Sequence, residues 1–498
     1  MLPQRWTLYP PSTLVQSNTH CQRRTYPVLI VNRIVDGIVA NLTPSEVGRL
    51  RLACRELGKK AVSGDYASHF HSRTVVYNVP DSVDTFIRLI KSSDWTAIVS
   101  KLKRVTIAGR CIHTPRTNDL EDPFDHNSNA IRELVLALHR LCDEPGNQQD
   151  LSIGLAVHDT RPKSPYVPRP YNYHREHRTG IAPTDWRPRW KTASELFAFT
   201  VDTLAASPCR IAGLDVFSCE QECALAMDKL RPALGNQGFA KSVRGLESLS
   251  LRLSQSLVTE EGELVPKKRN TINAQSQDSS GSEDSVSPSE ESSDAIDECL
   301  DNVAASADTD SAHYVRGLLD LCPMLTSLDI HWYQIKQGGS LSDIERRQAR
   351  FFNHLKTLRL AQLQNVSLAG FECRASALTA FAQNHRETLH SVNLDMIKLY
   401  RGKFEDFFNC VETQMRQLHA FEFDNLYERH HPVSFLVEGQ PNTRSTDRSD
   451  GPNRLHRAGQ DTRLPIEYRR MRGQRMGCPQ LYQLLWSLRQ KYGPPLAQ

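Results

Sequence analysis

The segments LTSLDI (325–330), LKTLRL (355–360), LHSVNL (389–394) and LHAFEF (418–423) are the basis for the predicted fold. Each has apolar residues at its first, fourth and sixth positions, and the segments begin 30, 34 and 29 residues apart. The same pattern occurs in LKRVTI (102–107), IAGLDV (211–216) and LESLSL (246–251), with a weaker copy at 151–153. Alternating apolar residues in short segments predict half-buried strands. Their nearly constant interval predicts a repeated structural unit.

Helix-like stretches lie between these copies, at 314–321, 376–384 and 404–415. A strand and a helix in each unit of about thirty residues are typical of a leucine-rich-repeat solenoid, in which only neighbouring units cover one another. A set of unrelated strands in an α/β domain is the alternative, but four copies in near-register favour repeats. The consensus Asn after the strand is mostly missing, and Asn365 is its best match, so the repeats are degenerate.

The composition agrees with a large, non-membrane protein. The chain has 498 residues, of which 39% are hydrophobic and 24% charged, with a net charge of +4. This length is too great for one core, and the small charge gives no reason to expect a nucleic-acid partner. The 12 cysteines show no CxxC pair or zinc-finger spacing, so we expect reduced thiols, with Cys54, Cys322 and Cys410 acting as small hydrophobic residues. We expect a cytoplasmic or nuclear protein with no membrane span.

Changes in composition along the chain suggest seven regions. The segment 276–301 has no Lys or Arg and many carboxylates, which predicts disorder. We expect a disordered tail over 1–27, a helical module over 28–72, the first part of the repeat array over 73–255, an acidic Ser-rich disordered insertion over 256–312, the second part of the array over 313–430, a basic disordered tail over 431–478 and an amphipathic helix over 479–491. A Pro/Arg/Tyr-rich loop is expected over 161–190.

The helical module contains the clearest family motif. Ile30, Ile34, Ile38 and Leu42 are four residues apart, as on one face of a helix. Thr43-Pro44-Ser45-Glu46 then reads as the start of a second helix. With the run LRLACREL (50–57), this segment resembles the F-box of many fungal proteins, which is often followed by degenerate leucine-rich repeats. The family's usual opening Leu-Pro and Glu correspond to Ile30-Val31 and Arg33 here.

The resemblance implies a substrate receptor of a cullin-based (SCF-type) ubiquitin ligase. It would dock to the Skp-type adaptor, and through it to the cullin scaffold, while the repeats bind a protein target. The residues that the resemblance places at the adaptor or in the core of the module are Ile34, Ile38, Leu42, Leu50, Leu52, Cys54, Arg55 and Leu57. The alternative is a stand-alone leucine-rich-repeat scaffold, in the nucleus or elsewhere in the cell, whose N-terminal helices only cap the array.

Other candidate sites follow from the residue pattern. Polar positions on the strands would face the target, which gives Ser327, Asp329, Thr357, Arg359, Ser391 and Asn393. Ser280, Ser282 and Ser287 precede acidic residues or proline and are candidates for phosphorylation. The sequence has no phosphate-binding glycine motif, HExxH or GxSxG, so we expect a non-catalytic protein without a cofactor or metal.

Overall fold

The computed structural model of the chain describes residues 71–91, 102–111, 127–143, 151–159, 187–218, 223–254, 312–333, 351–429, 431–436 and 454–470. The chain divides into two compact units, Met1–His71 with Thr96–Lys101 and Ser72–Trp95 with Leu102–Gln498. All helices and strands named below belong to the second unit. Residues 28–70 of the predicted helical module, 256–311 of the predicted acidic insertion and the predicted helix over 479–491 lie outside the described residues.

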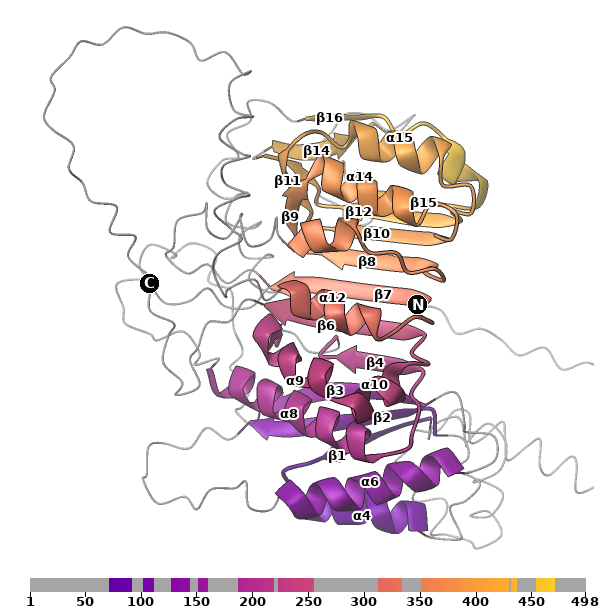
Figure 1. The fold of residues 1–498 in the computed structure, drawn as a ribbon. Coiled ribbons are helices and arrows are strands. Elements are labelled where there is room, and N and C mark those ends of the chain that lie inside the picture. The colour runs from indigo at the N-terminus through magenta and orange to yellow at the C-terminus, as the bar shows by residue number, and fades with distance from the viewer. Residues whose placement is uncertain are drawn as a thin grey trace, which may run out of the picture. The chain divides into compact units, whose positions relative to one another are not determined.

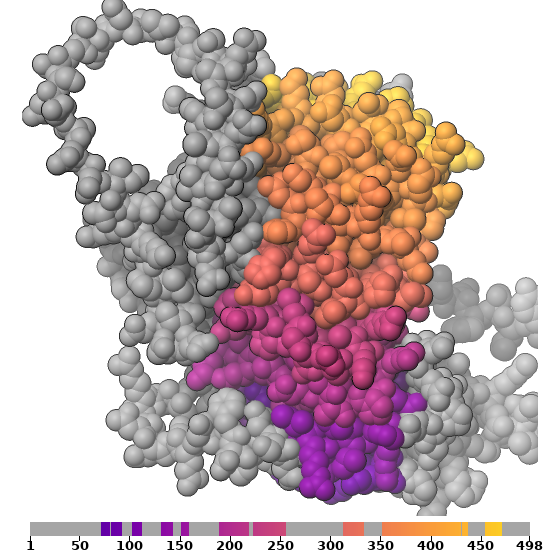
Figure 2. All heavy atoms as spheres, in the orientation of Figure 1, coloured from indigo at the N-terminus to yellow at the C-terminus, as the bar shows by residue number. Residues whose placement is uncertain are grey.

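The described residues form a mixed α/β structure around one large sheet of 11 strands. The strands follow one another across the sheet in chain order, and all neighbours are parallel except the last pair (Figure 1). They are β1 (Ser72–Val76), β2 (Arg104–Cys111), β3 (Ser152–Asp159), β4 (Gly213–Val216), β6 (Ser248–Ser254), β7 (Ser327–Tyr333), β8 (Asn365–Ala369), β10 (Ser391–Asp395), β12 (Ala420–Asp424) and the antiparallel β15 (Arg454–Ala458), while β5 (Leu225–Ala226) pairs with β6. The colour bands of Figure 2 accordingly follow the chain from indigo to yellow.

Helices connect the strands and lie on one side of this sheet (Figure 1). Their apolar residues are three and four positions apart, as in Val83, Phe86 and Ile87, so each helix buries one stripe against the sheet or a neighbouring helix. The connecting elements are α4 (Pro80–Lys91), α6 (Asn127–Asp143), α8 (Arg187–Ala206), the 3-10 turn η3 (Met227–Leu230), α9 (Arg231–Gly235), α10 (Gln237–Val243), α12 (Ala312–Asp320), α14 (Ala375–Asn384) and α15 (Glu405–Thr413). The sequence predicted α12, α14 and α15 to within two residues, and it did not predict the others.

A second sheet of five strands forms where the later main strands end. The backbone turns at a left-handed residue directly after β8, β10 and β12, namely Gly370 (φ 79), Met396 (φ 57) and Asn425 (φ 51). The short strands that follow pair with one another: β9 (Glu372–Arg374), β11 (Lys398–Arg401) and β13 (Tyr427–Glu428), with β14 (His431–Phe435) and β16 (Tyr468–Arg470) added antiparallel. A left-handed non-glycine residue costs about 1–2 kcal/mol, which the packing around these turns must offset.

One predicted strand is wrong. Residues 351–356 are helical and 358–360 are irregular, so LKTLRL ends a helix and the strand is β8. Leu355, Leu358 and Leu360 are buried in this helix end and the turn after it. The matching strand pattern is Leu363-Val366-Leu368. Asn365 is the first residue of β8 and is exposed, so it does not occupy the consensus Asn position.

Two expected loop regions contain regular structure. The Pro/Arg/Tyr-rich loop predicted over 161–190 is wrong for 187–190, which belong to α8. Residues 161–186 lie outside the described part. The predicted disordered tail over 431–478 is wrong for 431–436 and 454–470, where β14, β15, the 3-10 turn η6 (Gly459–Arg463) and β16 form. Buried Val433, Phe435, Leu455 and Ile466 attach these elements, although arginines are frequent between them.

The prediction that the cysteines are reduced is wrong for one pair, because Cys142 and Cys209 form a disulfide. Cys322 and Cys410 are buried and not disulfide-bonded, as expected, and Cys54 lies outside the described residues. Within the described ranges, we find no helix with the length and apolar content needed to cross a membrane.

A buried histidine holds the turn that replaces the predicted strand at 355–360. The Leu360 N–H donates to His385 Nε2 at 3.1 Å, and His385 Nδ1 lies 2.9 Å from the Phe381 carbonyl oxygen. Burial lowers the pKa of His385 below the ordinary 6.5, although the hydrogen bond to Phe381 opposes this shift. The folded protein therefore favours the neutral imidazole more than the unfolded chain does.

We predict that the contribution of His385 to the free energy of unfolding falls as the pH drops through 6.5, because the unfolded chain then takes up a proton that folded His385 resists. His385→Gln keeps an acceptor for Leu360 N–H but does not titrate, so the pH dependence should become shallower in urea unfolding curves. Exposed His419→Gln is the control. Equal slopes for wild type and His385→Gln would contradict the assignment.

A buried carboxylate attaches the C-terminal strands. The Glu428 side chain is 1% exposed and lies 3.2 Å from Arg470 Nε. Glu428 Oε1 accepts hydrogen bonds of 2.8 Å from the Phe404 N–H and from the Tyr468 hydroxyl. Burial and this hydrogen bond raise the pKa of Tyr468, which keeps its hydroxyl protonated as a donor.

Glu428→Ala should lower the free energy of unfolding by about 3–5 kcal/mol, because Arg470 then loses its buried counter-charge and two donors lose their acceptor. Chemical denaturation is the measurement. The matched control is Glu387→Ala, in the turn between α14 and β10. The Glu387 side chain is 75% exposed and pairs with the neighbouring exposed Arg386. A loss no larger than that of the control would show that Glu428 does not anchor β14 and β16.

Candidate polar binding face

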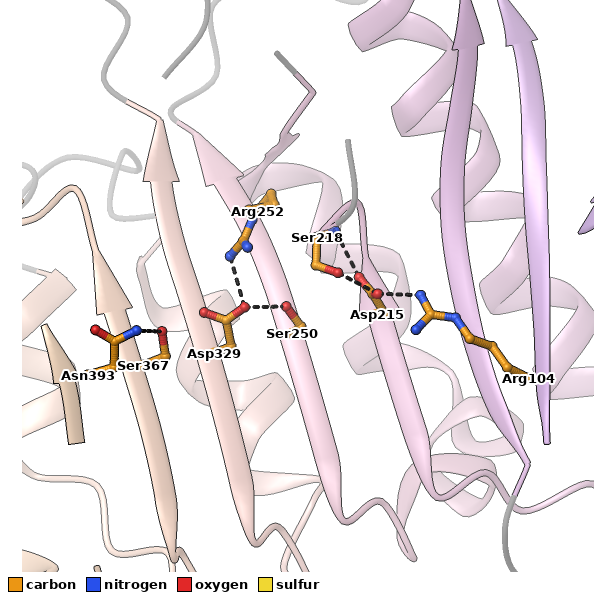
Figure 3. Close-up of polar contacts among 8 residues, drawn as sticks. All are labelled: Arg104, Asp215, Ser218, Ser250, Arg252, Asp329, Ser367 and Asn393. Atoms are coloured by element: carbon orange, nitrogen blue, oxygen red, sulfur yellow. Dashed lines mark hydrogen bonds and ion pairs between the residues drawn. The ribbon is translucent and has the colours of Figure 1, made fainter. Parts of the chain in front are cut away.

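Polar side chains cover the face of the main sheet that points away from the helices (Figure 3). We call this surface the polar face. Because the strands pair without register shifts from β2 to β12, the side chains line up in rows across the sheet. The first row is Arg104, Ser152, Gly213, Ser248, Ser327, Asn365, Ser391 and Ala420, and the second is Thr106, Gly154, Asp215, Ser250, Asp329, Ser367, Asn393 and Glu422. Most of these residues are half-buried.

An ion pair spans three strands at the N-terminal end of the polar face. Arg104 on β2 reaches across β3 so that its Nη2 lies 2.5 Å from Asp215 Oδ2 on β4. The guanidinium passes over Gly154, where a Cβ atom would stand 2.8 Å from Nη2. Ser218 completes the cluster, since its N–H donates to Asp215 Oδ1 at 2.8 Å and its hydroxyl donates to Oδ2. Gly154 thus provides the space that lets Arg104 reach Asp215.

A second cluster joins the next two strands. Asp329 on β7 accepts a hydrogen bond of 2.7 Å from the Ser250 hydroxyl and one of 3.0 Å from Arg252 Nη1, both on β6 (Figure 3). The Arg252 side chain is 16% exposed and that of Asp329 30%, so water screens this pair only in part. A charge-assisted contact of this kind fixes both side chains in one orientation.

Weaker contacts and one ion pair continue along the C-terminal strands. Asn393 Nδ2 lies 3.5 Å from Ser367 Oγ, at the limit of hydrogen bonding. Arg454 on β15 pairs with Glu422 on β12, and Asn425 Nδ2 donates to Asp395 Oδ1 at 3.4 Å. The polar face therefore combines charged pairs with small hydroxyl and amide side chains over its whole length.

The predicted target-binding residues fall into two groups. Ser327 and Asp329 on β7 and Ser391 and Asn393 on β10 lie on the polar face, as expected. Thr357 and Arg359 do not lie on a strand, because the predicted strand there is wrong; Asn365 and Ser367 take their places in the rows. The predicted adaptor-binding residues Ile34, Ile38, Leu42, Leu50, Leu52, Cys54, Arg55 and Leu57 and the phosphorylation candidates Ser280, Ser282 and Ser287 lie outside the described residues.

The prediction missed the residues of both ion-pair clusters except Asp329. They are Arg104, Asp215, Ser218, Ser250 and Arg252. The sequence contained a signal for three of them. Ser327 and Asp329 are the third and fifth residues of LTSLDI, and these positions are polar in other copies of the pattern. They hold Arg104 in LKRVTI (third), Asp215 in IAGLDV (fifth) and Ser250 in LESLSL (fifth). The pairing of Arg104 with Asp215 across an intervening strand has no sequence signal.

These contacts orient side chains and bind complementary groups, but they do not form a nucleophile–base pair of the kind used in covalent catalysis. Asp215 and Asp329 each bind an arginine and a serine hydroxyl. In the part of the chain that the structure describes, no three His, Cys, Asp or Glu side chains are grouped as metal ligands. The arrangement is an extended polar surface whose side chains are held by ion pairs and hydrogen bonds between neighbouring strands.

Comparison with known proteins gives no family assignment: no protein-family model matches the chain, and a search of curated proteins finds no match.

We predict that Gly154→Ala weakens the Arg104–Asp215 pair, because the new Cβ meets the guanidinium. The free energy of unfolding should fall by about 1 kcal/mol, the upper range for a partly exposed ion pair. In an Arg104→Met background the same change should cost less, which a double-mutant cycle measures. Gly235→Ala is the control, since a Cβ atom at Gly235 would meet none of the described atoms within 4 Å. An unchanged cost in the Arg104→Met background would contradict this account.

Proposed function

We propose that this chain is a non-catalytic binding protein built on a degenerate leucine-rich-repeat-type solenoid, and that it is a substrate receptor of a cullin-based ubiquitin ligase. The polar face holds a protein target, and residues 28–72 dock as an F-box to the Skp-type adaptor. The observation that carries the proposal is the main sheet, whose parallel strands follow one another in chain order. Such an order is expected of stacked repeats, in which each unit pairs only with its neighbours.

The later units support a repeat interpretation at the level of single positions. Leu363, Leu389 and Leu418 each begin a pattern in which the fourth, sixth and ninth residues are also buried. The ninth residues are Phe371, Ile397 and Leu426, all 0% exposed, at the position where leucine-rich repeats commonly have Asn. The eighth residue of each unit is left-handed, and the chain continues into a short second strand and, after β9 and β11, a helix. An apolar residue in place of the consensus Asn explains why the repeats are degenerate.

The polar face suits a protein target better than a small molecule. It extends over successive strands, and its side chains are held in register by backbone pairing and by the Arg104–Asp215 and Arg252–Asp329 contacts. Pre-ordered side chains reduce the entropy lost on binding, and an extended surface makes many weak contacts at once. Solenoids bind their partners through surfaces of this kind.

The adaptor part of the proposal rests on the LRLACREL motif at 50–57. Apolar residues at the positions of Leu50, Leu52 and Leu57 would pack in the module or against the adaptor, and a charge there would disrupt that packing. Ile30-Val31 and Arg33 replace the proline and the acidic residue of the family pattern, so the proposal relies on the LRLACREL motif.

We expect the full chain to capture a purified Skp-type adaptor–cullin complex in a pull-down, and the double variant Leu50→Asp, Leu52→Asp to lose that capture by tenfold or more, about 1.4 kcal/mol. Lys59→Asp with Lys60→Asp is the matched control, because it adds the same carboxylates just beyond the motif. Circular dichroism and thermal unfolding check that the repeats remain folded.

A second experiment tests whether the polar face binds the protein target, by placing positive charges on this face. Ser327→Arg with Ser391→Arg should reduce proteins that co-purify with the full chain, whereas Gln383→Arg on the exposed surface of α14 should not. In the adaptor pull-down, failure of both the wild type and the Lys59→Asp, Lys60→Asp control to capture the adaptor would exclude the ubiquitin-ligase role. The stand-alone repeat scaffold would then be the remaining alternative. If the face variant retains every partner, the polar face is not the binding surface.

A further inference from the structure

The disulfide between Cys142 and Cys209 joins two segments on the helical side of the N-terminal strands. Cys142 lies in the last turn of α6, and Cys209 lies between α8 and β4. Their Cα atoms are 5.7 Å apart and 67 residues separate them in the chain. The backbone therefore holds the two residues at the separation that a disulfide requires.

The other described cysteines have a different environment. Cys111, Cys223, Cys322, Cys373 and Cys410 are buried and are not disulfide-bonded. Burial raises the pKa of Cys322 to about 12, and burial also raises the pKa of Cys373 and Cys410. Because the thiolate is the reactive form, these buried thiols are poor partners for exchange. Among the described residues, thiol chemistry is concentrated at the Cys142–Cys209 pair.

The two cysteine residues of this pair differ in exposure. Cys209 is 0% exposed, and its N–H donates to the Ser207 hydroxyl at 3.2 Å. Cys142 is half-buried, at the end of a helix. A small thiol arriving from solvent therefore reaches Cys142 first, because it must approach along the axis of the S–S bond and Cys209 is covered.

We propose that Cys142–Cys209 is a redox-responsive disulfide and that Cys142 is the site at which small thiols and disulfides exchange with the chain. In reduction, a thiolate such as that of glutathione bonds to Cys142 Sγ, and the S–S bond breaks to release Cys209 as a thiolate. A second thiolate then bonds to the attached sulfur, releasing the Cys142 thiolate and a small disulfide. Oxidation reverses these steps with a small disulfide as the oxidant.

The exchange would control the attachment of α6. This helix packs against α4 and α8, and α8 packs on β2 and β3. The disulfide ties the end of α6 to the segment that leads into β4, and reduction removes this covalent link. Hydrogen exchange in the last turn of α6 should therefore increase on reduction. The inference does not depend on the proposed ubiquitin-ligase role.

The test uses the full chain and oxidised glutathione. In Cys209→Ser, we expect a mixed disulfide on Cys142; in Cys142→Ser, Cys209 should react about tenfold or more slowly in the native protein and at an equal rate in urea. Peptide mapping by mass spectrometry assigns the modified residue and separates it from cysteines elsewhere in the chain. Equal native rates at the two residues would overturn the assignment of Cys142.

Wild-type protein provides a second measurement that needs no variant. After mild oxidation, a non-reducing digest should contain a peptide that links Cys142 to Cys209, and a brief pulse of thiol should place the mixed disulfide on Cys142. Reductant should lower the thermal midpoint of wild type by several degrees and leave Cys142→Ser, Cys209→Ser unchanged. Failure to find the linked peptide, or an equal effect of reductant on the double variant, would overturn the proposal.

Discussion

The structure depends on the in-register pairing of each parallel strand with the one before it. Parallel neighbours cannot be joined by a tight turn, so the chain must return to the starting end of the sheet after every strand. The helices α4 to α15 and the turns between them are these return paths, and they lie on one side of the sheet (Figure 1). That leaves the other side to polar side chains, which the same register places in rows. The fold and the polar face thus have a common origin in backbone pairing.

Local apolar patterns predicted much of the fold. Segments identified in the sequence overlap seven strands of the main sheet, namely β2, β3, β4, β6, β7, β10 and β12. The prediction failed at 355–360, because three leucines at strand spacing can equally bury the end of a helix and a turn. The flanking Phe351 and Phe352, both buried, belong to that helix. The pattern did not predict β15 because this strand has a single buried residue, Leu455, and one apolar residue shows no alternation.

The candidate site was predicted in part for a related reason. Positions on a strand can be read from the repeat pattern, which placed Ser327, Asp329, Ser391 and Asn393 correctly. Contacts between strands depend on side-chain reach, and the path of Arg104 over Gly154 to Asp215 joins residues more than 100 positions apart. The Cys142–Cys209 disulfide is of the same kind, because only the folded α6 and α8 bring its ends together.

The reversed direction of β15 has a consequence for self-association. A sheet built from parallel repeats has an exposed edge that can template another parallel strand, and identical chains stacked at such edges would grow into filaments. Here the last described strand of the main sheet runs antiparallel to β12 and carries Arg454 and Arg457. A second copy of the chain therefore cannot extend the parallel order of strands at this edge with its own first strand, which disfavours end-to-end stacking at β15.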